Sequence, residues 1–235
     1  GVIAAEHIDA YYGPSHILFD VSFSMGAQDR VAVVGRNGAG KSTLLKSLMN
    51  AGPRVDGKVS WNGSELGGMP AYRRARLGLQ LVPEDRRIYH HLTLRENIRS
   101  AEHARDPSVP RISPDEVIEQ FPMLQPLKER MGFQLSGGQQ QVLAIARAFA
   151  ARPRLMLLDE PTEGVAPAIV EGMVETIRKV CAGNGTGLLL CEQNLWFARQ
   201  VTDRVVVMDT GRIVYDGSWA EFSRRPDIKK AHLAV

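Results

Sequence analysis

The chain has 235 residues, of which 44% are hydrophobic and 23% are charged, the balance of a globular protein with a sizeable core. No apolar run approaches the length of a membrane span, which excludes a membrane-spanning chain and leaves any membrane role to the aqueous side. The net charge of +3 suits nucleic acid, anionic lipid or phosphate ligands and does not choose among them.

The first third of the chain alternates strand and helix patterns. It predicts strands over 2–12, 17–25, 30–35, 57–63 and 77–85, and a helix over 41–51. Pro83 stops the last of these strands. The arginine-rich run 73–76 is interpreted as a solvated helix face.

The middle of the chain, from Glu84 to about Ala148, has sequence patterns typical of helices. Thr93 and Glu96 have the spacing of a capping box, which predicts a helix over 93–104. Ser136 and Gln139 have the same spacing, and the residues that follow place Val142, Ile145, Ala146 and Phe149 on one helix face.

In the last third of the chain, strand and helix patterns alternate again. It predicts strands over 154–160, 187–193, 204–209 and 212–217, separated by helices. Alternation at both ends of the chain favours an α/β fold built on a parallel sheet, with the middle as a helical insertion. Cys181 and Cys191 form no CxxC pair, and we expect both to be buried and reduced.

The run "GRNGAGKS" matches the phosphate-loop pattern G-x-x-x-x-G-K-[ST] between a predicted strand and a predicted helix. Its backbone N–H groups would surround the phosphates, Lys41 would bring a charge to the β- and γ-phosphates, and the Ser42 hydroxyl would ligate Mg²⁺. We expect nucleotide contacts from Gly35, Arg36, Asn37, Gly38, Ala39, Gly40, Lys41, Ser42 and Thr43.

Two acids end the apolar run "LMLLDE". Asp159 would lie at the carboxyl end of a buried parallel strand, where ligands bind in open α/β sheets, and would hold Mg²⁺ directly or through water. Glu160 is placed to act as a general base on an attacking water. Without the phosphate loop, two solvated acids at a strand end would be the simpler interpretation.

The motif "LSGGQ" lies between the phosphate loop and "LMLLDEP", and this order resembles that of the ATP-binding cassette ATPases over essentially the whole chain. The resemblance implies one domain over 1–235, with a RecA-like P-loop core at about 1–83 and 150–235. It also implies an antiparallel N-terminal β part and a helical subdomain at about 84–149. Cofactors would be ATP and Mg²⁺. Two cassettes of this family meet head to tail, so Ser136, Gly137, Gly138 and Gln139 would serve the partner's ATP.

Other positions are assigned by the same resemblance. Tyr12 would stack on adenine, with Tyr11 as a weaker candidate. Glu84 falls where most cassettes carry a glutamine that senses Mg²⁺ and the membrane partner. Gln193 falls where most carry a histidine on the γ-phosphate, and Ala166 falls where most carry an aspartate. A glutamine can donate to a phosphate but cannot become cationic.

The runs "VPEDRR", "EQN" and "GVAP" resemble the cassettes of branched-chain amino acid importers and of their urea and amide relatives. This implies a bacterial protein at the cytoplasmic face of the inner membrane. Its partners would be permease subunits, a second cassette (identical or a paralogue) and, indirectly, a substrate-binding protein.

Three alternatives remain: a nucleic-acid or ribosome cassette, a regulatory ATP-binding module, and an exporter. The short spacing between Lys41 and Ser136 leaves no room for a repair-type coiled coil, so we expect no nucleic-acid partner.

Overall fold

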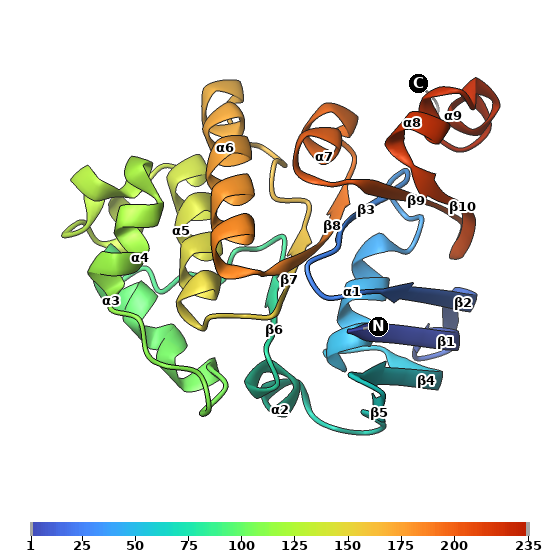
Figure 1. The fold of residues 1–235 in the computed structure, drawn as a ribbon, viewed down its shortest axis with the longest axis horizontal. Coiled ribbons are helices and arrows are strands. Elements are labelled where there is room, and N and C mark those ends of the chain that lie inside the picture. The colour runs from blue at the N-terminus through green and yellow to red at the C-terminus, as the bar shows by residue number, and fades with distance from the viewer. Residues whose placement is uncertain (1, 234–235) are drawn as a thin grey trace.

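The computed structural model describes residues 2–233 and contains two β-sheets with helices between and around them (Figure 1). The predicted domain covers 1–235, and its ends, at 1 and 234–235, lie outside the described residues. The strands are β1 (Ile3–Tyr12), β2 (Ser15–Met25), β3 (Arg30–Val34), β4 (Arg54–Trp61), β5 (Ser64–Glu65), β6 (Leu79–Val82), β7 (Leu155–Asp159), β8 (Gly187–Glu192), β9 (Arg204–Asp209) and β10 (Arg212–Ser218).

The larger sheet has six strands in the order β10-β9-β3-β8-β7-β6. Its strands are parallel except β10, which pairs antiparallel with β9. Strands β7 and β8 are buried along their whole length because helices cover both faces of the sheet. In β3, Ala32 and Val34 join one core cluster while Val31 and Val33 join the other, as the alternation of a strand requires.

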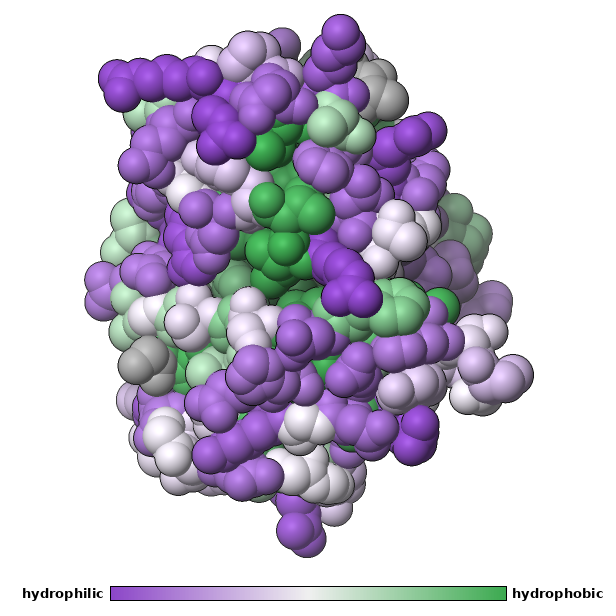
Figure 2. Space-filling model, turned by 90° about the vertical axis from the view of Figure 1, so that its right-hand side faces the viewer, coloured by the Kyte–Doolittle hydropathy of each residue, from purple (hydrophilic) through white to green (hydrophobic). Residues whose placement is uncertain are grey.

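The smaller sheet is antiparallel, in the order β2-β1-β4-β5. Its inner face and the six-stranded sheet enclose α1 (Lys41–Met49), whose Leu44, Leu45 and Leu48 are fully buried. Figure 2 shows the side of the molecule that lies at the right of Figure 1, where hydrophilic side chains surround an apolar band. The predicted combination of a parallel-rich sheet with an N-terminal antiparallel part is confirmed.

The segment between β6 and β7 is helical, and it lies on the opposite side of the six-stranded sheet from α1 (Figure 1). Both predicted capping boxes are present, at Thr93/Glu96 and at Ser136/Gln139. The first α-helix is shorter than predicted, because its last residues, 100–104, form the 3-10 helix η1. The α-helices here are α3 (Leu94–Arg99), α4 (Pro114–Gln120) and α5 (Gly137–Ala150), and the other 3-10 helices are η2 (Pro122–Leu127) and η3 (Gly132–Gln134).

Helix α5 presents Val142, Ile145, Ala146 and Phe149 to the core, so its predicted apolar face is confirmed. The remaining helices are α2 (Ala71–Arg76), α6 (Pro167–Asn184), α7 (Leu195–Val201), α8 (Trp219–Ser223) and α9 (Pro226–His232). Within residues 2–233, no helix is both long and apolar enough to cross a bilayer. Cys181 and Cys191 are buried and free.

The interpretation of residues 73–76 as a solvated face is wrong at one position. Arg74 is only 2% exposed, and it donates to the carbonyls of Leu48 at 2.7 Å, Gly67 at 2.7 Å and Met69 at 3.0 Å. Its guanidinium therefore satisfies carbonyls at the end of α1 and in the loop before α2. Helices α8 and α9 were not predicted individually, because they contain only 5 and 7 residues.

Candidate functional site

The phosphate loop connects β3, in the middle of the six-stranded sheet, to α1. Gly38 and Gly40 have φ angles of +81° and +102°, a backbone region that favours glycine. A Cβ at Gly40 would also lie 2.8 Å from Leu18 Cδ2. The sequence pattern of the loop is therefore imposed by its backbone shape and by its packing under β2.

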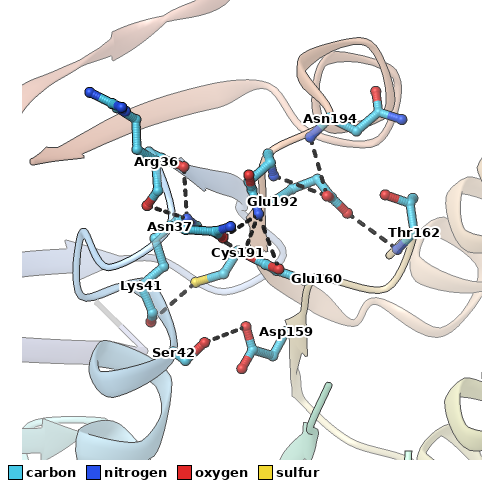
Figure 3. A network of polar contacts seen from close by, with 12 residues as sticks. Arg36, Asn37, Lys41, Ser42, Asp159, Glu160, Thr162, Cys191, Glu192 and Asn194 are labelled. Atoms are coloured by element: carbon cyan, nitrogen blue, oxygen red, sulfur yellow. Dashed lines mark hydrogen bonds and ion pairs between the residues drawn. The ribbon is translucent and has the colours of Figure 1, made fainter. Parts of the chain in front are cut away.

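Lys41 is 4% exposed and points back into the loop. Its Nζ donates to the carbonyls of Gly35 at 2.7 Å and Arg36 at 3.0 Å, and it lies 3.5 Å from Glu160 Oε1. The loop and the acid after β7 thus meet around one ammonium group, although they are more than 100 residues apart in the sequence (Figure 3).

The two acids at the end of β7 have different surroundings. Asp159 accepts a hydrogen bond from Ser42 Oγ at 3.0 Å. Burial raises the pKa of Asp159, the bond from Ser42 lowers it, and the nearby carboxylates of Glu160 and Glu84 raise it further. Glu160 is 8% exposed and has a φ of +44°, a strained conformation for a residue with a side chain.

Gln193 follows β8 and connects the phosphate loop to Glu160 through hydrogen bonds. Its Nε2 donates to Asn37 Oδ1 at 2.6 Å and to the Glu160 carboxylate at 3.2 and 3.4 Å. From the sequence we predicted a nucleotide contact for Gln193 and another for Asn37, but no contact between the two residues. The sheet order places β3 beside β8 and β8 beside β7, so their carboxyl ends bring both side chains to Glu160.

Glu192 was not identified as a site residue from the sequence. It is 2% exposed, and its carboxylate accepts hydrogen bonds from the backbone N–H groups of Gln193 at 3.0 Å, Asn194 at 3.2 Å and Thr162 at 3.4 Å (Figure 3). Burial raises the pKa of Glu192, and these hydrogen bonds lower it. The carboxylate ties the turn carrying Gln193 to the segment after Glu160. The available signal was an acid as the last residue of an apolar strand.

A cavity of about 460 Å³ opens beside the phosphate loop and is lined by Ser42, Lys46, Glu84 and Asp159 among others. No cluster of three or more metal-ligating side chains of the His, Cys, Asp and Glu types occurs in the described range 2–233. A hydroxyl with one or two carboxylates nevertheless fits Mg²⁺, which keeps several waters and the substrate phosphates as ligands. The Ser42–Asp159 contact supplies such a pair, and Glu84 adds a nearby charge.

The motif at 135–139 begins α5, with Ser136 as N-cap. Gln139 N donates to Ser136 Oγ at 3.2 Å, and Ser136 N donates to Gln139 Oε1 at 2.9 Å. A Cβ at Gly138 would lie 2.6 Å from Ile169 Cδ1, so a side chain here would displace the end of Ile169 in α6. None of the hydrogen bonds formed within residues 2–233 joins this motif to the phosphate loop.

The two candidate aromatic residues differ in their surroundings. Tyr11 stacks on His16 with ring centroids 4.3 Å apart, and the Arg54 guanidinium lies 4.4 Å from the Tyr11 centroid. Tyr12 is 41% exposed at the end of β1 and makes no such stack in the described range. Because Tyr11 is used in packing, Tyr12 remains the candidate for adenine. Ala166 is the N-cap of α6 and gives it no side-chain cap.

A glycine loop with a buried lysine, a hydroxyl–carboxylate pair and a second acid at the carboxyl edge of a parallel sheet define a P-loop nucleotide-binding protein. The chain belongs to the ABC transporter family, whose family description matches residues 18–163. It is an ATP-binding subunit of that family and an ATPase.

Similarity to named proteins supports the same family assignment. The high-affinity branched-chain amino acid transport ATP-binding protein BraG of Pseudomonas aeruginosa is 36% identical over 99% of this chain and 99% of its own length. The probable branched-chain amino acid transport ATP-binding protein LivF of Archaeoglobus fulgidus is 32% identical over 97% of both chains. A solved structure of an ATP binding subunit of an ABC transporter is 28% identical, with a TM-score of 0.81 over 100% of this chain and 97% of that one.

Proposed function

We propose that the chain hydrolyses Mg-ATP at the carboxyl edge of its larger sheet and uses the reaction to drive solute import through permease subunits. The observation that carries the hydrolytic part is the contact of Glu160 with both Lys41 and Gln193. A base, a phosphate-binding cation and an amide donor lie within one hydrogen-bonded group, as in-line attack on a γ-phosphate requires.

Each residue has one role in this proposal. Lys41 leaves the carbonyls of its own loop and binds the β- and γ-phosphates. Glu160 orients and deprotonates water, and Gln193 holds Glu160 and donates to the γ-phosphate. When bound, Mg²⁺ neutralises phosphate charge, with Ser42, Asp159 and Glu84 holding it. The nucleotide is contacted by Tyr12 at the adenine and by the loop residues 35–43.

The motif LSGGQ at 135–139, called the signature motif below, acts on a second subunit. Ser136, Gly137, Gly138 and Gln139 cover the ATP held by the facing phosphate loop, in a head-to-tail dimer with an identical or paralogous cassette. The absence of hydrogen bonds between the motif and the phosphate loop of the same chain, within residues 2–233, supports this arrangement. Closure excludes water and completes two sites at once.

The solute is a branched-chain amino acid, or urea or a short amide. Two relatives, at 36% and 32% identity, are named as branched-chain amino acid transport proteins, which supports the amino acid. The chain sits at the cytoplasmic face of a bacterial inner membrane. Its helical segment at about 84–149 faces the permease, its core at about 1–83 and 150–235 holds the nucleotide, and a substrate-binding protein delivers the solute.

The test is ATP hydrolysis and solute uptake by the assembled complex in vesicles. We expect Mg-ATP turnover that rises with valine, leucine or isoleucine in the presence of the binding protein. Ser136→Arg should abolish turnover while the isolated chain still binds ATP. A complex that binds ATP without hydrolysing it would contradict the proposal and favour a regulatory module.

A further inference from the structure

A tight turn after β6 places one arginine against the signature motif. Arg86 and Arg87 both have left-handed backbones, with φ angles of +63° and +49°. Arg147 of α5 holds this turn by donating to the carbonyl of Arg87 at 2.8 Å and to that of Arg86 at 3.0 Å. The turn is therefore fixed to the same helix that begins with the signature motif.

The side chain of Arg86 is also fixed. It is half-buried, and its Nε donates to Gln141 Oε1 at 3.0 Å. Gln141 is 2% exposed and lies one turn into α5. A Cβ at Gly137 would lie 3.1 Å from Arg86 Nη1. Gly137 therefore leaves room for a guanidinium that lies against the first residue of α5.

The charge of Arg86 is not compensated at this position. The N-terminus of α5 carries positive potential, so an arginine beside it is unfavourable without an anion. Arg86 forms no ion pair within residues 2–233, and its Nη1 and Nη2 donate to none of those residues. Arg87, by contrast, lies 3.2 Å from the Asp85 carboxylate.

A second unpaired donor lies next to it. The Nε2 of Gln141 is buried and has no hydrogen-bond partner among residues 2–233. Among the described residues, both N–H donors of the buried Gln141 Nε2 are unpaired, and the Arg86 guanidinium held by Gln141 keeps two free nitrogens beside the first residue of α5. Unpaired donors are therefore concentrated beside the start of α5, and an anion bound there would satisfy the guanidinium nitrogens of Arg86.

We propose that Arg86 is part of the signature's anion site and contacts the terminal phosphate of the nucleotide held by the facing subunit. This inference rests on the head-to-tail dimer of the proposed function and adds to it a cation supplied in trans. Gln141 positions the guanidinium, Arg147 positions the turn, and Gly137 admits the side chain. The planar fork of arginine suits a phosphate better than an ammonium group does.

The experiment measures ATP-dependent dimerisation of the full chain in the Glu160→Gln background, which slows hydrolysis. Light scattering after size-exclusion chromatography gives the dimer dissociation constant, and a fluorescent ATP analogue gives the nucleotide affinity of the dilute monomer. Arg86→Gln is compared with Arg86→Lys and with Arg99→Gln. Arg99 is an exposed arginine of α3 and serves as the matched control for loss of one positive charge.

We expect Arg86→Gln to raise the dimer dissociation constant at least about tenfold, because each dimer loses two charge-assisted phosphate contacts. Arg86→Lys should recover part of this loss, Arg99→Gln should change nothing, and monomer affinity for ATP should stay within about twofold. An unchanged dimer constant in Arg86→Gln overturns this inference alone. An equal loss of monomer ATP affinity also overturns it, since Arg86 would then act in its own chain. If Glu160→Gln neither dimerises nor binds ATP, the proposed function fails as well.

Discussion

The substitution Glu160→Gln tests the centre of the site, because the glutamate contacts both Lys41 and Gln193. Glutamine keeps the length of the side chain and an oxygen that can accept from Gln193. It cannot remove a proton from water. Loss of a positioned general base typically lowers the rate by about 10²–10⁴, and we expect kcat to fall in this range.

The same change should strengthen ATP binding. Charges 3.5 Å apart attract by roughly 5 kcal/mol at an effective dielectric constant of about 20, before desolvation is subtracted. The desolvation cost of burying both groups offsets most of that attraction. If about 1 kcal/mol of it holds Lys41 away from the nucleotide, removing the charge should tighten ATP binding about fivefold.

The assays are phosphate release by the assembled complex and ATP titration of the isolated chain. Glu171→Gln is the matched control, because Glu171 is an exposed acid of α6. A variant that keeps more than about one tenth of wild-type turnover would refute the role of Glu160 as general base. Weaker ATP binding in Glu160→Gln would refute the competition between Glu160 and nucleotide for Lys41.

Four further outcomes are expected. Lys41→Ala should weaken ATP binding by about two orders of magnitude or more, since a buried cation between two phosphates is lost, and wild-type affinity in a titration would contradict the site. Gln193→His should change kcat by less than about tenfold, because histidine also donates to a phosphate; a loss as large as that of Glu160→Gln would show that the amide is indispensable. Ala166→Ser should raise the free energy of unfolding in urea by about 0.5–2 kcal/mol by capping α6, and an unchanged midpoint would mean that the N–H groups there are already satisfied. Glu192 has a pKa above its ordinary value of 4.5 in the folded chain, so the folded state gains its proton first, and acidification from about pH 7 to about pH 5 should stabilise wild type relative to Glu192→Gln. Urea unfolding of both proteins at the two pH values measures this, and a constant difference would show that Glu192 does not titrate.

Local patterns in the sequence were sufficient to predict the phosphate loop, two helix starts and a buried strand of this protein. The phosphate loop depends on glycines and a lysine within eight residues, and both capping boxes depend on side chains three residues apart. The strand that ends at Asp159 is apolar throughout because both faces of the sheet are covered. Each of these features is set by neighbours along the chain or by burial alone, so it can be recognised without coordinates.

Tertiary structure decided how the side chains meet. Gln193 reaches Asn37, 156 positions away, only because β3 and β8 are neighbours in the sheet. The two tyrosines of "YYG" look alike in the sequence, and packing of His16 on one of them leaves the other free. Arg74 and Arg86 both occur in basic runs, yet one caps buried carbonyls while the other lies against Gly137. A long side chain can turn toward solvent or core with similar local energy, so its surroundings in the fold determine its role.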